Sequence, residues 1–344
     1  MKKGNRKIAP ILLHYYITYR CNCRCVFCDI WKQSNVPDAK LTTTRSNLSQ
    51  AKKCGVKFVD FTGGEPLCHA ALPEMLQCAK NQKLLTSITT NCLLYPKRAK
   101  ELSGLITFLH FSLDALDPNL HNHIRGRDVF DAVMHSIDIA LSLGEKPDLL
   151  FTVTEDTIDQ LALLAEFAKK LRLMLIVNPV FSHSTSHSLA NTALKQIEHY
   201  SSIPFVYVNK AFHMLRRQGG NSTALPRCRV MDSTIVISPD NKLLLPCYHF
   251  ARENLSVTSL KSLFETEKWQ YYQHYQGRFD FCQGCHLNCY FDPSFNYRFD
   301  KLFLSSLAAK TKYVWEKHVL RRFYPKTGIK ADNLANSILK KHQN

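Results

Sequence analysis

The sequence predicts an α/β fold, a partial (β/α)6 TIM-like barrel, on the basis of three observations. Between residues 10 and 181, short β-rich runs alternate with helical stretches, a pattern typical of parallel strands joined by right-handed crossovers. Several of these runs are apolar at nearly every position, as expected for strands that are covered on both faces. Polar residues and glycines collect where four of the runs end, at the edge where parallel α/β folds bind ligands.

The individual elements follow from the same pattern, and their number is two βα units short of a complete TIM barrel. We expect strands at residues 11–19, 56–63, 84–91, 108–115, 148–155 and 173–181. We expect helices at residues 43–53, 72–81, 128–143 and 158–170. A polar stretch near residue 185 predicts a boundary, so we place the barrel core at residues 8–190 and a connecting segment at residues 191–224.

The composition is that of a soluble globular protein, with 344 residues of which 45% are apolar and 21% charged. No run of about 20 apolar residues predicts a transmembrane helix. The basic and then apolar start is similar to a signal peptide, but its apolar part is short, contains His14 and ends in Arg20, so we interpret it as the first strand. The net charge of +17 indicates an acidic partner such as phospholipid, nucleic acid or a phosphorylated substrate.

Seven of the thirteen cysteines gather in two places, at residues 21–28 and 282–289. Secreted disulfide scaffolds are short and spread their cysteines more evenly, so this distribution favours metal binding in a reducing cytoplasm. The other six stand singly along the chain, at Cys54, Cys68, Cys78, Cys92, Cys228 and Cys247.

The first cluster, "CNCRCVFC", places Cys21, Cys25 and Cys28 in a Cys-x3-Cys-x2-Cys pattern after the first strand. Closely spaced thiolates hold iron–sulfur clusters, and three ligands leave the fourth iron of a four-iron cluster open. Zinc is the alternative, but zinc knuckles usually combine two Cys-x2-Cys pairs, or one pair with histidines, and no second pair lies nearby.

This pattern resembles the signature of the radical S-adenosylmethionine (SAM) superfamily, Cys-x3-Cys-x-aromatic-Cys at the end of the first barrel strand, with Phe27 as the aromatic residue. The resemblance covers about residues 10–185. It implies that Cys21, Cys25 and Cys28 hold a four-iron four-sulfur cluster whose open iron takes the amino and carboxylate groups of SAM, with Phe27 near the adenine. Cys23 falls outside the pattern.

The Gly-Gly-Glu-Pro element at the end of the second strand also resembles the superfamily. The resemblance implies that Gly63, Gly64, Glu65 and Pro66 receive the amino group of SAM. The chemistry is reasonable because a carboxylate attracts an ammonium group and glycines allow the backbone to approach closely.

Four further positions match the superfamily less specifically. The resemblance implies that Ser112 and Asp114 face the SAM ribose or the substrate and that Arg125 meets a carboxylate. It also implies that Asn178 lies where the sixth strand passes the adenine.

The activity that the resemblance implies is the reductive cleavage of SAM to methionine and a 5′-deoxyadenosyl radical, which abstracts hydrogen from a substrate. An electron donor such as flavodoxin or ferredoxin is then required. The protein's own task is to position the substrate and to exclude water around the radical.

The second set of cysteines surrounds a predicted hairpin, "VISPDNKLLLPC", with a Pro-Asp-Asn turn. Residues 225–292 resemble the auxiliary-cluster extension called SPASM, or its shorter relative Twitch. The resemblance implies one auxiliary four-iron four-sulfur cluster on Cys228, Cys247, Cys282 and Cys285. Cys289 is then an alternative ligand or a free thiol. Structural zinc stays open, because four thiolates suit it equally well.

No catalytic residue is identified by the sequence alone. Cys68 and Cys92 follow the second and third strands at the expected barrel mouth, where a thiol would suit a base, and Asp114 is a third candidate. Buried cysteine is the commoner role, and we interpret His14 and His110 as core histidines.

The last segment, residues 293–344, is basic and aromatic, with eleven Lys or Arg against three acidic residues from position 298 onward. We expect a basic amphipathic helix at residues 298–324. This helix would hold the barrel mouth near the anionic inner face of the cell membrane. A helix packed on its own barrel is the alternative. RNA binding is permitted by the charge, but no RNA-binding motif supports it.

Three functions compete on this basis. The first is modification of a ribosomally made peptide, and the second is modification of a small molecule such as a sugar, lipid or cofactor precursor. The third is a non-catalytic zinc or electron-transfer protein, against which the Gly-Gly-Glu-Pro element argues, because a carrier needs no ammonium pocket. The sequence does not identify the substrate.

Overall fold

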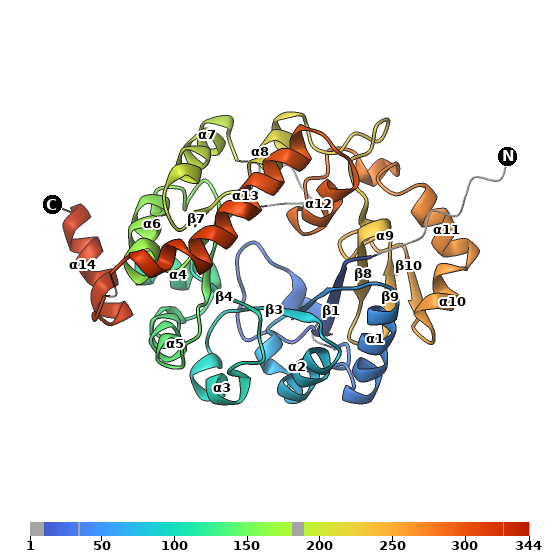
Figure 1. Cartoon of the computed structure of the whole chain (residues 1–344), viewed down its shortest axis with the longest axis horizontal. Helices are drawn as coiled ribbons and strands as arrows, with labels where there is room; N and C mark the ends of the chain where they lie inside the picture. Colours follow the sequence, from blue (N-terminus) through green and yellow to red (C-terminus); the bar gives the residue numbers. More distant parts are fainter. Residues whose placement is uncertain (1–9, 34, 181–188, 326, 344) are drawn as a thin grey trace.

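A single ten-stranded sheet organises the chain. The structure, a computed structural model, describes residues 10–33, 35–180, 189–325 and 327–343. The strand order is β10-β9-β8-β1-β2-β3-β4-β5-β6-β7, and the sheet curves so that its helices form an arc on the outside (Figure 1). This is the α/β architecture of a partial barrel that the sequence predicts.

The barrel strands are parallel, and each pairs with the next along the chain. All six predicted strands are confirmed, and the short β7 adds a seventh at the edge. Their bounds are β1 (Leu12–Thr18), β2 (Phe58–Gly63), β3 (Leu85–Thr90), β4 (Phe108–Ser112), β5 (Asp148–Val153), β6 (Leu175–Pro179) and β7 (Val206–Tyr207).

The crossover helices confirm the four that the sequence predicts and add two. They are α1 (Leu41–Lys53), α2 (Leu72–Asn81), α3 (Tyr95–Leu102), α4 (Pro118–Arg125), α5 (Phe130–Ser142) and α6 (Gln160–Leu171). The unexpected α3 and α4 each have eight residues and a proline in their first turn. The Asp117 side chain also caps α4 by accepting from the Leu120 N–H, so a start signal was present in the sequence.

The predicted hairpin is confirmed as β8 (Thr234–Ile237) and β9 (Lys242–Leu245), which pair antiparallel. Its turn contains Asn241 in the left-handed region, at φ 62°, which asparagine tolerates better than most residues. β8 also pairs in parallel with β1, and β10 (Glu253–Ser256) extends the sheet from β9. The C-terminal region therefore continues the barrel sheet.

Eight further α-helices lie in the described part of the chain after β6. They are α7 (Asn191–His199), α8 (Lys210–Arg217), α9 (Val230–Ser233), α10 (Leu260–Phe264), α11 (Glu267–His274), α12 (Asn288–Ser294), α13 (Lys301–His318) and α14 (Ala331–Gln343). α13 crosses the molecule beside α8, and α14 packs on α5 and α6 (Figure 1). In the described ranges, no helix has the length and hydropathy needed to cross a bilayer.

Alternate residues of β1 face opposite sides of the sheet, as strand geometry requires. Tyr15 points outward, where its hydroxyl accepts from the Asn47 amide of α1 at 3.0 Å. His14 and Tyr16 point to the other side, where they line a cavity inside the barrel. The first strand thus supplies side chains to both the core and the candidate site.

Candidate functional site

The cysteine loop, residues 21–28, leaves β1 and is fixed by the end of α4. The Arg24 N–H donates to the Arg125 carbonyl at 3.1 Å, and the Val26 N–H donates to the Ile124 carbonyl at 3.0 Å. Gly126, at φ +62°, lies so close that an added Cβ would stand 2.4 Å from the Arg24 carbonyl oxygen. A side chain at this position would therefore displace the loop.

The predicted first cysteine set lies together in this loop. The Cys21 sulfur accepts from the Cys23 N–H at 3.4 Å, and the Cys28 N–H donates to the Cys25 carbonyl at 3.1 Å. Burial raises the pKa of Cys21 to about 12, with smaller contributions from the nearby Glu65, Cys25 and Cys28. Cys23 is buried beside them.

A buried charge network joins this loop to β4. Arg125 forms an ion pair with Asp114 at 2.7 Å, and its Nη1 lies 3.8 Å from the Cys25 sulfur. Its guanidinium carbon also stands 5.6 Å from the centre of the Phe27 ring. Burial raises the pKa of Asp114, and the guanidinium opposes that shift. Arg125 therefore contacts three other predicted site residues, and its positive charge lies beside the Cys25 thiol.

The two glycines of the Gly-Gly-Glu-Pro element let β2 leave the sheet close against the end of β1. Gly63 has φ +144°, and an added Cβ would stand 1.9 Å from the Thr18 carbonyl oxygen. At Gly64 an added Cβ would stand 2.3 Å from the Arg20 carbonyl oxygen. The element is therefore held directly beside the start of the cysteine loop.

Glu65 is buried and joins three strand ends. Its Oε1 accepts from the Leu67 N–H at 3.0 Å and its Oε2 from the Asn91 N–H at 2.8 Å. The Asn91 amide in turn donates to the Asn22 side chain in the cysteine loop at 2.7 Å. Burial raises the pKa of Glu65, and the two backbone donors oppose this. Each carboxylate oxygen keeps a lone pair with which it can accept a further donor.

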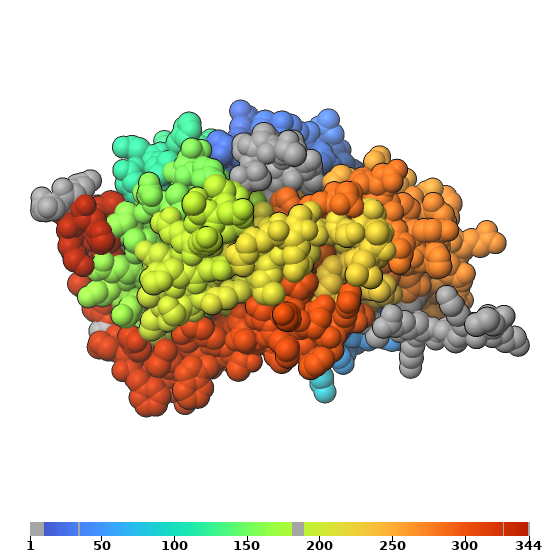
Figure 2. Space-filling view, turned by 90° about the horizontal axis from the view of Figure 1, so that it is seen from above, coloured from blue at the N-terminus to red at the C-terminus, as the bar shows by residue number. Residues whose placement is uncertain are grey.

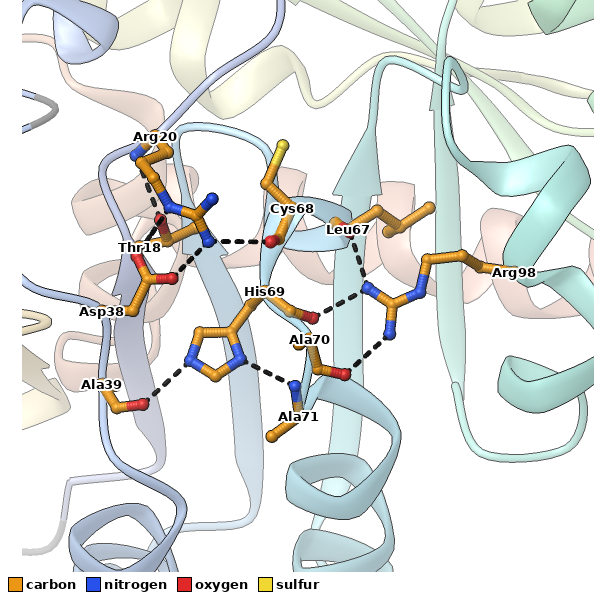
Figure 3. A network of polar contacts seen from close by, with 10 residues as sticks. All are labelled: Thr18, Arg20, Asp38, Ala39, Leu67, Cys68, His69, Ala70, Ala71 and Arg98. Atoms are coloured by element: carbon orange, nitrogen blue, oxygen red, sulfur yellow. Dashed lines mark hydrogen bonds and ion pairs between the residues drawn. The ribbon is translucent and has the colours of Figure 1, made fainter.

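Two arginines that the sequence analysis did not identify hold the segment after Glu65 (Figure 3). Arg20 pairs with Asp38 and donates to the Cys68 carbonyl at 2.9 Å. Arg98 donates from α3 to the Leu67 carbonyl at 2.6 Å. The Cys68 sulfur points away from these contacts (Figure 3). Neither arginine belongs to a local motif, so the sequence carried no signal for this clamp.

A cavity of about 1090 Å³ opens between the cysteine loop and the C-terminal hairpin region. Phe27, Cys28 and Gly63 line it from the barrel, and Cys289 lines it from the C-terminal region. The remaining predicted residues of the barrel are not among its lining residues: Cys21, Cys25, Gly64, Glu65, Pro66, Cys68, Cys92, Ser112, Asp114, Arg125 and Asn178. The cavity thus touches both cysteine sets.

His14 is a cavity residue, which corrects our interpretation of it as a core histidine. Its Nδ1 lies 3.0 Å from the Asp60 carboxylate, and both residues line the cavity. Its Nε2 has no hydrogen-bond partner among the described residues. Tyr16 stacks on Tyr248 in the same wall, with ring centres 4.2 Å apart and planes at 12°. Because residues two apart in a strand share a face, the sequence could have placed His14 on the same side of β1 as Tyr16.

The catalytic candidate Cys92 is fully buried and has φ 71°. Burial raises its pKa well above the ordinary value, so its thiol stays neutral. His110, the other histidine that we interpreted as core, lies 3.4 Å from the buried Asp148 carboxylate and is not a cavity residue.

The second cysteine set is gathered around one buried asparagine, Asn221, which the sequence analysis did not identify. Its side-chain amide donates to the carbonyls of Gly277 at 2.8 Å and Cys282 at 3.1 Å, and its side-chain oxygen accepts from the Cys228 N–H at 3.1 Å. Its backbone N–H donates to the Cys285 carbonyl at 2.9 Å. One residue therefore sets the spacing between Cys228 and the loop of Cys282 and Cys285.

The thiols of this set lower one another's acidity. Burial raises the pKa of Cys247 to about 12 and that of Cys282 to about 11, with Cys285 contributing to both. Burial also raises the pKa of Cys228 well above its ordinary value, with the same neighbour contributing. For Cys289 the contributors after burial are Cys247 and Cys285. The five thiols therefore lie in the same region of the fold.

Both sets have the donor chemistry that an iron–sulfur cluster requires. In the described part of the chain, no three His, Cys, Asp or Glu side chains form a closed site for a single metal ion. Grouped, buried thiols ionise at an electrostatic cost, because burial and neighbouring thiolates disfavour the negative charge. Coordination to iron offsets this cost because the cation stabilises the thiolate form. The residues present therefore fit the clusters that the superfamily resemblance implies.

Comparison with known proteins agrees with this geometry. Residues 15–168 match the family described as "Radical SAM superfamily". The probable GTP 3′,8-cyclase of Methanococcus aeolicus is 32% identical over 180 residues, which cover 50% of this chain and 59% of the relative. That of Methanosarcina mazei is 31% identical over 218 residues, covering 57% and 63%. The matches thus span less than two thirds of these relatives' own length.

Solved structures share the fold over a longer part of the chain. SuiB of Streptococcus suis bound to its precursor peptide SuiA superposes with a TM-score of 0.64 at 16% identity, covering 86% of this chain and 76% of SuiB. The enzyme anSMEcpe with bound AdoMet has a TM-score of 0.61 at 16% identity, covering 96% of this chain and all of that one. Because the identities are low, these likenesses concern the fold. The family match shows that residues 15–168 form a radical SAM domain, and the likeness of fold extends beyond that domain.

Proposed function

We propose that this enzyme binds SAM and a four-iron four-sulfur cluster at the cysteine loop and abstracts hydrogen from a substrate in the cavity. When bound, the cluster and SAM supply a 5′-deoxyadenosyl radical. The observation that carries the proposal is the position of the cavity, which reaches from Phe27 and Cys28 at one wall to Cys289 at another. A substrate there would meet both cysteine sets.

The chain's own residues divide the work of binding. Cys21, Cys25 and Cys28 would hold the iron, while Glu65 would accept the ammonium group of SAM with its remaining lone pairs. Arg125 supplies positive charge beside Cys25. We retain Ser112 and Asn178 as predicted SAM contacts.

For the second set we propose one auxiliary four-iron four-sulfur cluster held by Cys228, Cys247, Cys282 and Cys285. The support is that burial and the neighbouring cysteines of this set raise the pKa of Cys228, Cys247 and Cys282. Cys289 lines the cavity, unlike the other four. We therefore assign Cys289 as a free thiol that faces the substrate.

The substrate that we propose is a small molecule. The relatives with the higher sequence identity act, by name, on GTP, whereas the likeness to the peptide-binding SuiB concerns the fold alone. The cavity must also hold SAM, and its volume leaves space for a second ligand of comparable size. The stacked Tyr16 and Tyr248 offer a flat apolar wall to a planar group.

The proposal includes a partner and a compartment. We propose flavodoxin or ferredoxin as the electron donor, because the reductive cleavage consumes one electron. We also propose a cytoplasmic location, where the thirteen free cysteines remain thiols.

Metal content after anaerobic reconstitution tests the proposal. We expect about eight irons per chain, from two four-iron clusters, and slow release of 5′-deoxyadenosine with SAM and dithionite. Cys25→Ala should remove about half of the iron, whereas its neighbour Cys23→Ala should leave all of it. Cys247→Ala should remove the other half, whereas Cys289→Ala should not. Stoichiometric zinc without visible iron–sulfur absorbance would contradict the proposal.

A further inference from the structure

The charge on α13 is largely used inside the molecule. Each of three lysines on this helix pairs with an acidic side chain, and the most buried pair is Lys317 with Asp148. The pairs are Lys310 with Asp292 at 3.1 Å, Lys312 with Glu316 at 2.8 Å and Lys317 with Asp148 at 2.7 Å. Lys317 fastens α13 to β5 and Lys310 fastens it to α12, whereas the pair of Lys312 with Glu316 lies within α13. The packed-helix alternative therefore describes one face of α13.

The opposite face of α13 is an exposed apolar stripe, formed by Leu304, Leu307, Val314 and Trp315. Their spacing of three, seven and one places them on one side of the helix. Trp315 is 55% exposed, and Phe323, just beyond the helix end, is 77% exposed. The stripe belongs to a band of C-terminal chain that lies open along one side of the molecule (Figure 2).

A basic end patch adjoins this stripe and consists of Lys146, Arg172, His318, Arg321 and Arg322. Arg172 donates to the carbonyls of Arg321 at 3.3 Å and Tyr324 at 3.0 Å, which joins the barrel to the tail. The pKa of Lys146 is lowered by burial and by the nearby arginines. Lys146, His318 and Arg322 are exposed. The nearby Asp148 carboxylate is already engaged by Lys317, so the patch presents uncompensated positive charge.

The patch and the cavity lie at opposite ends of the barrel strands. Lys146 and Arg172 precede β5 and β6, at the amino ends of these strands. The cysteine loop and the Gly-Gly-Glu-Pro element follow the carboxyl ends of β1 and β2. This corrects our expectation that the tail holds the barrel mouth near a membrane.

We propose that the apolar stripe, Phe323 and the basic end patch together dock this enzyme on an anionic phospholipid surface, with the cavity turned toward the cytoplasm. Exposed aromatic and aliphatic side chains beside uncompensated cations match the interface of an anionic bilayer. RNA fits less well, because a strand bound at the amino ends of the strands would lie away from the cavity. This inference concerns where the enzyme works and does not depend on the chemistry proposed above.

Vesicle co-sedimentation of the reconstituted full-length protein tests the proposal. Vesicles with equal amounts of phosphatidylcholine and phosphatidylglycerol should bind the protein at low salt, and vesicles of phosphatidylcholine alone should not. Lys146→Glu/Arg322→Glu should lower the partition by more than about 30-fold, because each basic side chain lost contributes roughly fivefold and each added carboxylate is repelled by the anionic surface. Trp315→Ser/Phe323→Ser should lower it independently of salt.

The matched control is Lys97→Glu/Lys100→Glu, which makes the same change of charge on α3. This helix lies on the other side of the barrel from α13 (Figure 1). The control should bind vesicles like the unchanged protein, and all variants should keep their iron. If the control and the patch variant lost vesicle binding equally, the binding would depend on net charge alone and the proposal would be overturned. Tighter binding to labelled single-stranded RNA than to vesicles, lost in the patch variant, would overturn it in favour of nucleic acid.

Discussion

Asn221 shows how a single residue can organise a site without touching substrate. It donates to the Gly277 and Cys282 carbonyls and accepts from the Cys228 N–H, and it is almost fully buried. Asn221→Leu keeps the approximate volume but leaves these groups unpaired, at a cost of about 1–3 kcal/mol for each. We expect iron content to fall from about eight to about four per chain, with the cysteine-loop cluster retained.

Two variants separate this positioning role from general destabilisation. Asn221→Asp keeps the acceptor for Cys228 but loses both donors, so it should alter the spectrum and potential of the auxiliary cluster before iron is lost. Asn47 is equally buried and donates to Tyr15. Asn47→Leu should therefore lower stability while leaving all the iron in place. Full iron in Asn221→Leu would show that the cysteines find their positions without it.

The residues that sequence identified are those whose chemistry lies within a few positions of one another. Cys21, Cys25 and Cys28 form one such local pattern, and Gly63 to Glu65 form another. Asn221 escaped notice because the two carbonyls to which its amide donates are 56 and 61 residues away, where no spacing rule applies. His14 was misjudged because only the folded sheet brings Asp60 beside it.

At the scale of elements, α4 holds the cysteine loop, and Gly126 is its point of contact. Gly126→Ala adds a Cβ that would stand 2.4 Å from the Arg24 carbonyl oxygen, at a φ of +62°. We expect a loss of more than about 1 kcal/mol in unfolding free energy and faster loss of the visible cluster absorbance under a chelator.

Gly104 provides the matched control for this prediction. It has φ +73°, and an added Cβ there meets nothing within 4 Å. Gly104→Ala therefore carries the backbone strain without the clash, and its clusters should be as durable as those of the unchanged protein. Equal chelator sensitivity in the two variants would mean that the loop does not depend on this contact.

The elements themselves could be predicted where their pattern is long and apolar. Several of the six barrel strands have nearly continuous apolar runs, and the turn at Asn241 marked the hairpin. The eight-residue α3 and α4 were missed because so short a helix shows too little periodicity. The pairing of β8 with β1 could not be inferred, because parallel strands so far apart in sequence share no local signal.

At the scale of the whole molecule, the amino and carboxyl ends of the strands have separate tasks. The carboxyl ends carry the cysteine loop and the cavity. The amino ends carry the Asp148 carboxylate, which binds Lys317 and Tyr313 of α13. Because α13 also packs on α8, the C-terminal chain ties the open edge of the sheet together. The stability of the sheet edge therefore depends on the C-terminal chain as well as on the barrel.

His213 of α8 makes the stability of this fold depend on pH. The side chain is only 1% exposed, and burial lowers its pKa from an ordinary 6.5 to about 4, although Glu198 opposes the shift. The unfolded chain therefore binds a proton at this residue between about pH 6.5 and 4, whereas the folded chain does not. The contribution of His213 to the unfolding free energy is therefore fully present above pH 6.5. It is lost as the pH falls, by about 2 kcal/mol near pH 5.

The measurement is the unfolding free energy of the unchanged protein and His213→Gln between pH 7.5 and 5. The variant should be the less stable at pH 7.5, because it disturbs a buried contact, and the difference should shrink as the pH falls. Acid damage to the clusters acts on both proteins alike and cancels from the comparison. His123→Gln, at an exposed histidine, should follow the unchanged protein at every pH. A constant difference between His213→Gln and the unchanged protein would mean that His213 is protonated in the folded chain, so that its burial imposes no acid limit on this fold.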